Sequence, residues 1–419
     1  MSRLLVLGVG PLPFEQRKRA YGSSLRTWHF IRPLLKAGHT VHLIAMQLPD
    51  PHHEENLPQI MEIPTGIPDF TYYSVNELYV FMDLPYLQMH CDAFQPEAVI
   101  GINTHASGQA CRLNTNAPIW ADLNGWVMAE AQAKAHRYQD DHFLEHFWKQ
   151  EEPVLKRADR ISVVSTPQKF ACIGELAAVG RLTRESFGYD FLTVIPNSVN
   201  HEEPVIGPPV LSRQGVSNSD FVVLWSGGYN TWTDIPTLFE GLTLAMEKNP
   251  RIRFVSTGGA ISGHDDKTYP DFLNRIQSNP YKDRFTMLGW VDGSDIPSIY
   301  TESHLGLNVD GDNYETLFGA RNRLNAMMSL SLPVLSTPGT EVMEELTRNQ
   351  LALTFQRGSA KDLADKILWA ADHPSEIKQM GFKGKEYIKE HWADTVTTRE
   401  LQKWAESPSH APDYSGGKS

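Results

Sequence analysis

Two stretches near the start of the chain decide its fold: LLVLGVG at residues 4–10 and GHTVHLIA at residues 38–45. The first is a short apolar run that ends in glycines, which is typical of a buried parallel strand entering a loop. Residues 24–36 carry a helical pattern, which Gly38 and His39 end before a second strand at residues 40–45. A strand, a helix and a strand in this order predict a right-handed crossover in a parallel sheet.

The same alternation continues along both halves of the chain. In the first half we predict strands at 97–102, 118–123, 160–165 and 192–196, and one long helix at 127–156. In the second half we predict strands at 221–225, 253–256, 285–288, 305–309 and 333–336, and helices at 235–247 and 360–371. Strands that alternate with helices favour parallel sheets covered on both faces.

The periodicity lapses at residues 201–219, where proline, glycine and serine are frequent, as in a linker. A chain of 419 residues also suits two domains of about 200 residues each. We therefore predict an α/β protein of two Rossmann-like, doubly wound parallel-sheet domains that face a central cleft. The N-terminal domain would span 1–200 and the C-terminal domain 220–395, followed by a helix and a frayed tail at 396–419.

Charge and cysteine content exclude several classes of partner. The formal net charge is −12, whereas a protein that binds nucleic acid needs a cationic face to neutralise phosphates. The cysteines, Cys91, Cys111 and Cys172, show neither disulfide nor metal-site spacing, which indicates a reducing, cytoplasmic setting. No apolar run approaches the roughly 20 residues of a membrane span. Membrane contact would be at most peripheral, through the basic trio Arg-Lys-Arg at 17–19, for which a solvated loop is the alternative.

Several motifs, in this order, resemble those of glycosyltransferase family 4 and its GT-B relatives. They are Gly22-Ser23-Ser24, Gly38-His39-Thr40-Val41, Ser162-Val163-Val164-Ser165, Ile195-Pro196-Asn197-Ser198-Val199-Asn200, Met287-Leu288-Gly289-Trp290-Val291, and Asn322-Arg323-Leu324 with Met328, Pro333 and Val334. The resemblance implies a GT-B glycosyltransferase whose C-terminal domain holds a nucleotide-diphosphate sugar, UDP- or GDP-linked, while the N-terminal domain faces the acceptor. It also implies transfer with retention, and a base-contacting loop that contains Trp290 and Val291.

The chain departs from this family where the donor is held. The two family glutamates that typically bind the donor ribose fall at Phe318 and Ala326. The family's Arg and Lys after the first strand of the donor domain have no counterpart within residues 227–234, and the glycine before the Pro-Val pair is Ser331. Other residues must therefore neutralise the diphosphate.

Residues 314–323, YETLFGARNR, offer replacements for the missing cations. Charge builds on a departing diphosphate, and arginine forks and helix N-terminal N–H groups stabilise it without a metal. We expect Gly319 and Ala320 to let the backbone approach a phosphate, and Arg321 and Arg323 to bind it, so that Arg321→Ala weakens nucleotide-diphosphate binding. The alternative is that both arginines are surface helix residues.

The remaining donor-side candidates follow predicted strands. Glycines there permit close approach of a ligand, or merely form turns; they are Gly227, Gly228, Gly258 and Gly259. Trp290 would wall the base pocket or fill a core. Glu315 would accept hydrogen bonds from sugar hydroxyls or serve as a helix-start charge, with Asp310 and Asp312 as weaker candidates.

Two residues of the N-terminal half, His105 and Asp122, are the candidates for acid–base catalysis because each lies at the end of a predicted strand. A histidine after a strand is often only a structural hydrogen-bonding group. In a retaining reaction the leaving phosphate could itself take the acceptor proton.

The chain carries no convincing zinc spacing, Walker motif or GxSxG motif, so we expect no obligatory metal, no NTPase and no simple serine hydrolase. The acceptor would be a saccharide, a lipid-linked glycan or a small molecule. Two alternatives remain open: a GT-B nucleotide-sugar epimerase or hydrolase, and a catalytically reduced GT-B module that binds a glycan or a partner protein. The sugar and the oligomeric state also remain open.

Overall fold

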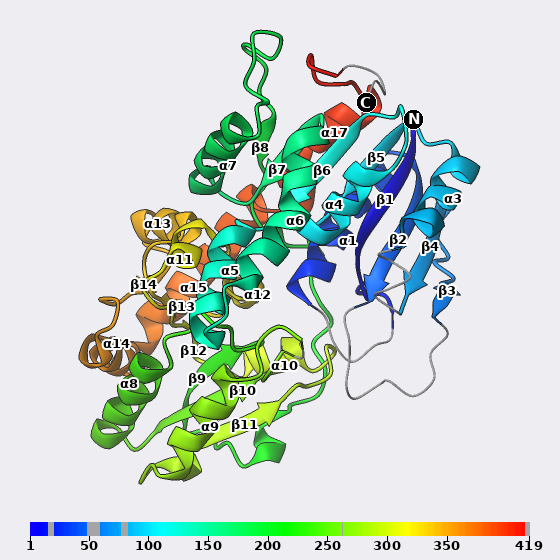
Figure 1. Cartoon of the computed structure of the whole chain (residues 1–419). Coiled ribbons are helices and arrows are strands. Elements are labelled where there is room, and N and C mark those ends of the chain that lie inside the picture. The colour runs from blue at the N-terminus through cyan, green and yellow to red at the C-terminus, as the bar shows by residue number, and fades with distance from the viewer. Residues whose placement is uncertain (16–20, 48–58, 77–82, 201, 262, 415–419) are drawn as a thin grey trace.

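The computed structural model describes residues 1–15, 21–47, 59–76, 83–200, 202–261 and 263–414, and it contains two lobes, each built on its own sheet (Figure 1). The basic trio at 17–19 lies outside these residues. We call the first sheet with its helices the N-terminal lobe, and the second sheet with its helices the C-terminal lobe.

The sheet of the N-terminal lobe has the order β3-β4-β2-β1-β5-β6-β7-β8 and is parallel except at β3, which runs antiparallel to β4. Its strands are β1 (Arg3–Gly10), β2 (Thr40–Gln47), β3 (Ile60–Glu62), β4 (Phe70–Val75), β5 (Ala98–Gly101), β6 (Ile119–Leu123), β7 (Arg160–Val163) and β8 (Leu192–Val194). Strand β1 pairs with β2 along its whole length, which confirms the predicted strand–helix–strand unit.

Helices cover both faces of this sheet because successive strand residues point to opposite sides. Leu5 and Leu7 of β1 join the core on one side, and Leu4 and Val6 join the core on the other. The helices are α1 (Gly22–Lys36), α3 (Leu84–Phe94), α4 (Thr104–Arg112), α5 (Val127–Tyr138), α6 (His142–Arg157) and α7 (Thr166–Ala178).

The sheet of the C-terminal lobe is parallel throughout and has the order β11-β10-β9-β12-β13-β14. Its strands are β9 (Phe221–Ser226), β10 (Ile252–Thr257), β11 (Phe285–Gly289), β12 (Leu305–Asn308), β13 (Val334–Ser336) and β14 (Leu353–Thr354). Both sheets are thus doubly wound, as predicted.

Helices again lie on both faces of the second sheet, over two separate apolar cores. They are α8 (Ile235–Lys248), α9 (Thr268–Gln277), α10 (Ile296–Thr301), α11 (Tyr314–Phe318), α12 (Asn322–Ser329), α13 (Glu341–Arg348), α14 (Ala360–Asp372) and α15 (Pro374–His391). Among the helices of the described residues, none has the length and apolar character needed to cross a membrane.

The single helix predicted at 127–156 is wrong, because the structure has two helices there. Gln139 adopts a left-handed conformation, with φ 57°, which ends α5. Helix α6 then begins at His142 and packs back against α5. Asp141 is the N-cap of α6, and the N–H of His142 donates to the Asp140 side chain at 3.0 Å, so this acidic pair marks the start of the second helix.

The C-terminal helices α16 (Asp394–Thr397) and α17 (Arg399–Glu406) lie against α1. Figure 1 shows α17 beside the sheet of the N-terminal lobe. Trp404 packs on Trp120 of β6, with ring centroids 5.5 Å apart. The frayed tail predicted within 396–419 is corrected as far as residue 414, because Ala411 is buried in the N-terminal core and Asp413 pairs with Arg181.

Candidate active site

The candidate active site is a cavity of ≈ 320 Å³ between the two lobes, at the carboxyl ends of both sheets. In each sheet the order of strands reverses next to the cavity, between β1 and β5 and between β9 and β12, and such switch points are where doubly wound sheets bind ligands. The N-terminal lobe contributes Tyr21, Gly22, Ser23, Asn124, Gly125, Trp126, Glu130 and Asn197 to its wall. The C-terminal lobe contributes Ser226, Gly227, Gly228, Asn230, Trp232, Ile261, Trp290, Glu315, Gly319, Ala320, Arg321, Asn322 and Arg323.

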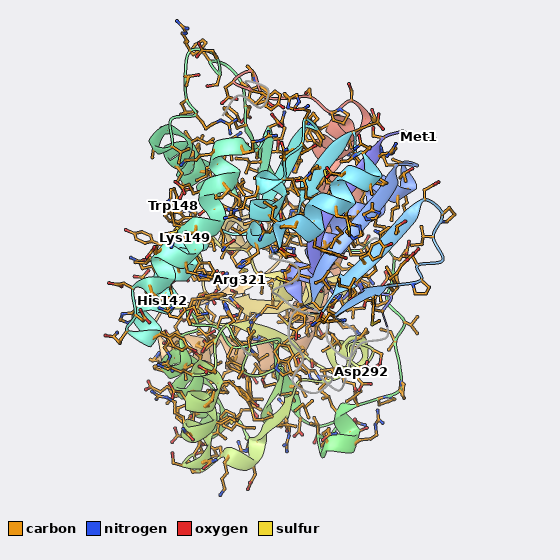
Figure 2. All side chains as sticks on the ribbon, turned by 45° about the vertical axis from the view of Figure 1, so that its right-hand side comes forward. Met1, His142, Trp148, Lys149, Asp292 and Arg321 are labelled. Carbon is orange, nitrogen blue, oxygen red and sulfur yellow. The ribbon has the colours of Figure 1, made fainter. Side chains whose placement is uncertain are left out.

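Arg321 lies where the two lobes meet (Figure 2) and is held by two carboxylates. Its Nη1 and Nη2 donate to the Glu315 carboxylate at 2.9 and 2.5 Å, and its Nε donates to Asp310 at 2.8 Å. All three side chains are almost fully buried. Arg321 lines the cavity but already forms ion pairs with two carboxylates, so its diphosphate-binding role remains a prediction.

Gly319 makes this ion cluster possible. A β-carbon at residue 319 would collide with Oε1 of Glu315 and would lie 2.6 Å from Nη1 of Arg321. We predicted that Gly319 lets the backbone approach a phosphate. In the structure, the side chains of Glu315 and Arg321 lie in the space beside Gly319. The cluster holds two carboxylates for one guanidinium, and burial is the main reason that the pKa of Glu315 rises to about 7.

Arg323 has very different surroundings from Arg321. Its Nη2 donates to the carbonyl of Gly228 at 2.7 Å, and its guanidinium carbon lies 4.2 Å from the ring centroid of Trp225. Its Nη1 is buried and has no hydrogen-bond partner among the described residues, and none of their carboxylates forms an ion pair with it. Burial lowers its pKa to about 10, so the group keeps its charge at neutral pH. Arg323 is therefore a half-buried cation that forms no ion pair with a carboxylate of the described residues.

The glycine pairs predicted to approach a ligand separate into two groups. Gly227 and Gly228 follow β9 and line the cavity. Gly258 and Gly259 lie behind them, where Gly259 accepts a backbone hydrogen bond from Tyr229. Gly258 and Gly259 are not among the described residues that line the cavity.

Trp290 lines the cavity, with its ring centroid 6.3 Å from that of Tyr21 in the opposite lobe. Its indole N–H donates to the carbonyl of Ala260 at 3.0 Å, which fixes the ring. Val291, predicted from the same motif, instead packs against the apolar core of the C-terminal lobe. The position of Trp290 fits the wall of a base pocket, and that of Val291 fits a core role.

The predicted acid–base residues lie away from the described residues of the cavity wall. Asp122 is fully buried and accepts from Nη2 and Nε of Arg26 at 2.7 and 2.8 Å, and from the Ser162 hydroxyl. His105 packs beside His146, and burial lowers its pKa to about 4. Neither residue is among the described residues that line the cavity, so their acid–base roles remain predictions.

The two weaker candidates, Asp310 and Asp312, also have structural partners. Asp310 belongs to the Arg321 cluster, whereas the exposed Asp312 pairs with Arg357.

Several wall residues were not predicted. Tyr21, Trp126 and Glu130 come from the N-terminal lobe, and Asn230 and Trp232 come from the loop after β9. Trp126 also contacts Phe318 of the other lobe, at 4.7 Å between ring centroids. Their position after strand ends was a usable signal, because those ends meet at the cleft.

Comparisons with known proteins agree with this architecture. A family model described as glycosyl transferase-like matches residues 238–401. No curated protein matches the chain in sequence. Sucrose-phosphate synthase from Thermosynechococcus elongatus superimposes with a TM-score of 0.71 at 17% identity, over 97% of this chain and 99% of that chain.

Two further solved structures are similar over the same extent. Anabaena HepE in complex with UDP-glucose has a TM-score of 0.67 at 15% identity, over 97% of this chain and all of that chain (100%). S. aureus TarM in complex with UDP has a TM-score of 0.65 at 10% identity, with 97% and 100% covered. The chain has the GT-B fold and resembles a divergent GT-B glycosyltransferase.

Proposed function

We propose that this protein transfers a sugar from a UDP-sugar to a hydroxyl group of a saccharide, lipid-linked or small-molecule acceptor, with retention and without an obligatory metal. The glycosyl transferase-like match in the C-terminal half supports the class of reaction. The structural neighbours bound to UDP or UDP-glucose support the choice of donor. We assign the acceptor side to residues 1–200, the linker to 201–219, the donor side to 220–395 and the closing segment to 396–419.

The observation that carries the proposal is the Arg323 guanidinium in the cavity wall, whose buried Nη1 has no hydrogen-bond partner among the described residues. A buried cation without a counter-ion is costly, and an anionic ligand removes that cost. The diphosphate of a UDP-sugar supplies the oxygen acceptors that a planar guanidinium binds best. Arg323 would therefore take the place of the family cations that the loop after β9 lacks.

The start of α12 lies at the same place in the cavity, with Asn322 and Arg323 as its first residues. Unpaired N–H groups at a helix start attract anions. Gly22 of the opposite lobe packs close to Asn322, since a β-carbon added at residue 22 would lie 2.5 Å from Nδ2 of Asn322. Both lobes thus approach the proposed diphosphate position.

The proposed reaction forms a bond between the acceptor oxygen and the anomeric carbon, and breaks the bond from that carbon to the diphosphate oxygen. The negative charge that develops on the diphosphate is stabilised by Arg323 and the α12 start. The leaving phosphate accepts the acceptor proton, so the reaction needs neither His105 nor Asp122 as a base. Glu130 and Glu315, from opposite lobes, offer carboxylate oxygens for sugar hydroxyls.

Trp290 is the proposed stacking surface for uracil. The cysteines of the described residues are unpaired and buried, which fits our proposal of a cytoplasmic setting.

The test is calorimetric titration of UDP into the wild type, Arg323→Gln, and the control Arg348→Gln on α13. Losing a charge-assisted hydrogen bond costs about 1.5–3 kcal/mol, so we expect at least about tenfold weaker binding for Arg323→Gln. The Arg348 variant should bind like the wild type. Equal affinity in all three proteins, or no binding of UDP or GDP to the wild type, would reject the proposal.

Product analysis then separates the reactions. Incubation of UDP-glucose with candidate acceptors should give a glycoside that retains the donor configuration. Free sugar released at the same rate without acceptor would identify a hydrolase, and binding without turnover would identify a catalytically reduced module.

A further inference from the structure

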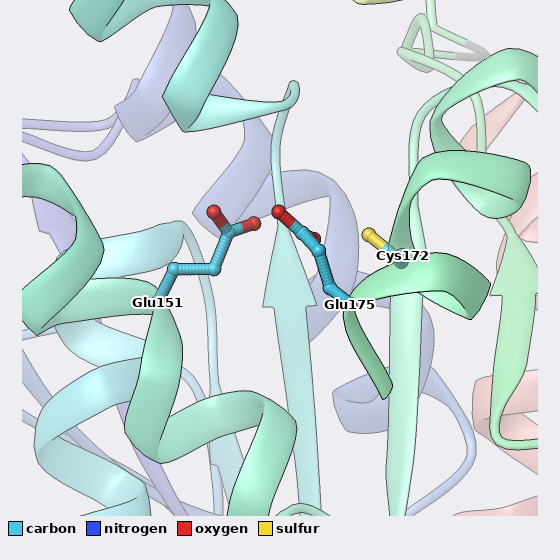
Figure 3. A group of neighbouring side chains, drawn as sticks. All are labelled: Glu151, Cys172 and Glu175. Carbon is cyan, nitrogen blue, oxygen red and sulfur yellow. The ribbon is translucent and has the colours of Figure 1, made fainter. Parts of the chain in front are cut away.

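A second cluster of reactive side chains lies inside the N-terminal lobe, between α6 and α7 (Figure 3). It consists of Glu151, Cys172 and Glu175, and one ligand atom from each lies within 4.8 Å of the others. Cys172 and Glu175 are three positions apart on α7 and so share one face. Figure 3 shows the Glu151 carboxylate of α6 directed at that face.

The Glu151 carboxylate is the unusual member of this cluster. The residue is fully buried, and neither carboxylate oxygen has a hydrogen-bond partner within the described part of the chain. Oε2 of Glu175 also has no hydrogen-bond partner among the described residues. Burying a carboxylate without compensation costs several kcal/mol. Burial raises the pKa of Glu151 and of the Cys172 thiol well above their usual ranges, so their anionic forms need a nearby cation.

We propose that Glu151, Cys172 and Glu175 bind one zinc-like divalent cation. A thiolate with two carboxylates suits Zn²⁺, whereas Ca²⁺ and Mg²⁺ prefer sites built from oxygen alone. The ion would displace the thiol proton and any carboxyl protons into solvent, and a water molecule would complete four-coordination. Sequence spacing does not indicate this site because its third ligand comes from another helix.

This inference is independent of the proposed transfer reaction, although the two sites are connected. Oε1 of Glu175 accepts a hydrogen bond from Nε1 of Trp126 at 2.8 Å, and Trp126 lines the cavity between the lobes. The indole also packs on Phe318. An ion that orients Glu175 would therefore stabilise one wall of the cavity without touching a substrate.

Metal binding is tested on the full chain after chelator treatment, by calorimetric titration with Zn²⁺ and elemental analysis of the dialysed protein. We expect one bound ion per chain and a higher melting temperature. Cys172→Ser and Glu151→Gln should each weaken binding at least tenfold. Cys111→Ser, which removes another buried thiol outside the cluster, should leave the affinity unchanged.

A spectrum of the wild type loaded with Co²⁺ provides a test that does not depend on how the variants fold. A sulfur-to-cobalt charge-transfer band is expected if Cys172 is a ligand, and it should persist in Cys111→Ser. Bound cobalt without this band, no saturable metal binding, or wild-type affinity in Cys172→Ser would overturn the proposal. A metal-free cluster would mean that protons alone compensate the carboxylates.

Discussion

Arg321 and Arg323 are close neighbours in the chain, yet their charges have opposite surroundings. Arg321 forms ion pairs with Asp310 and Glu315, whereas Arg323 contacts a carbonyl and an aromatic face and pairs with no acid of the described residues. A compensated cation stabilises the fold, and an uncompensated one is available to a ligand. The two arginines should therefore respond differently to substitution.

Arg321→Met should destabilise the protein by about 3–5 kcal/mol, because it leaves two buried carboxylates without a cation. Arg323→Met removes a half-buried charge that pairs with no acid of the described residues, so its loss of stability should be clearly smaller. Urea unfolding of both variants measures the difference. Equal destabilisation would contradict this assignment of their surroundings.

Glu315 should make stability depend on pH. Its pKa is about 7 in the folded protein and about 4.5 when unfolded. Between pH values near these two pKa values, Glu315 holds a proton in the folded state that it has lost in the unfolded chain. The free energy of unfolding therefore falls as pH rises through this window, by roughly 3 kcal/mol from this group.

Glu315→Gln removes the titrating group while keeping an acceptor for Arg321. Urea unfolding at pH 5 and pH 8 should show a smaller loss of stability in this variant than in the wild type. Parallel pH profiles would show that another group causes the dependence.

At the scale of elements, the short link between α11 and α12 determines the floor of the cavity. Glu315 lies on α11, Gly319 ends that helix, and α12 begins at Asn322. The link is short, so the Glu315–Arg321 pair can close across it only where residue 319 has no side chain. The Glu315–Arg321 ion pair and the start of α12 therefore depend on the same short link.

Gly319→Ala should separate the Glu315–Arg321 pair and displace the start of α12. We expect loss of stability of about 1–3 kcal/mol from crowding, together with weaker UDP binding. Gly293→Ala is the matched control, because an added β-carbon there meets no atom within 4 Å. Thermal unfolding with and without UDP measures both effects, and identical behaviour of the two variants would contradict the crowding argument.

At the scale of the whole molecule, the C-terminal segment joins the two lobes. Helix α15 packs on α12 of the C-terminal lobe, and the chain then crosses to place α17 on the N-terminal lobe. A buried ion pair between Arg32 and Asp394, with Nε to Oδ2 at 2.6 Å, fixes the crossing. Helix α17 and Ala411 therefore complete the core of the first lobe.

Trp404→Ala should destabilise the N-terminal lobe by about 3–5 kcal/mol, as expected for a large buried aromatic. Trp369→Ala, at a more exposed site on α14, should have a much smaller effect. Circular dichroism during urea unfolding measures both. An equal effect of the two substitutions would show that α17 contributes little to the core.

Much of the fold was predictable because its signals are local. Apolar strands, helical periodicity and glycine-rich turns define two alternating α/β halves, and a strand–helix–strand unit permits few arrangements. The break between α5 and α6 was missed because Gln139 has no strong turn preference yet takes a left-handed conformation, although Asp140 and Asp141 after it are residues that favour helix starts. The docking of the tail was missed because its apolar partners belong to the first half of the chain.

The site was predictable only in part, because charge compensation is a property of contacts. The sequence by itself determined that two doubly wound lobes place glycine, arginine and aromatic residues at facing strand ends. Tertiary structure alone decided which charged groups are already paired. Asp122 pairs with Arg26, and Arg321 pairs with Glu315 and Asp310. Arg323 pairs with no acid among the described residues. The reason is that a strand or a helix is encoded by neighbours in sequence, whereas the charge free for a ligand depends on groups that only folding brings together.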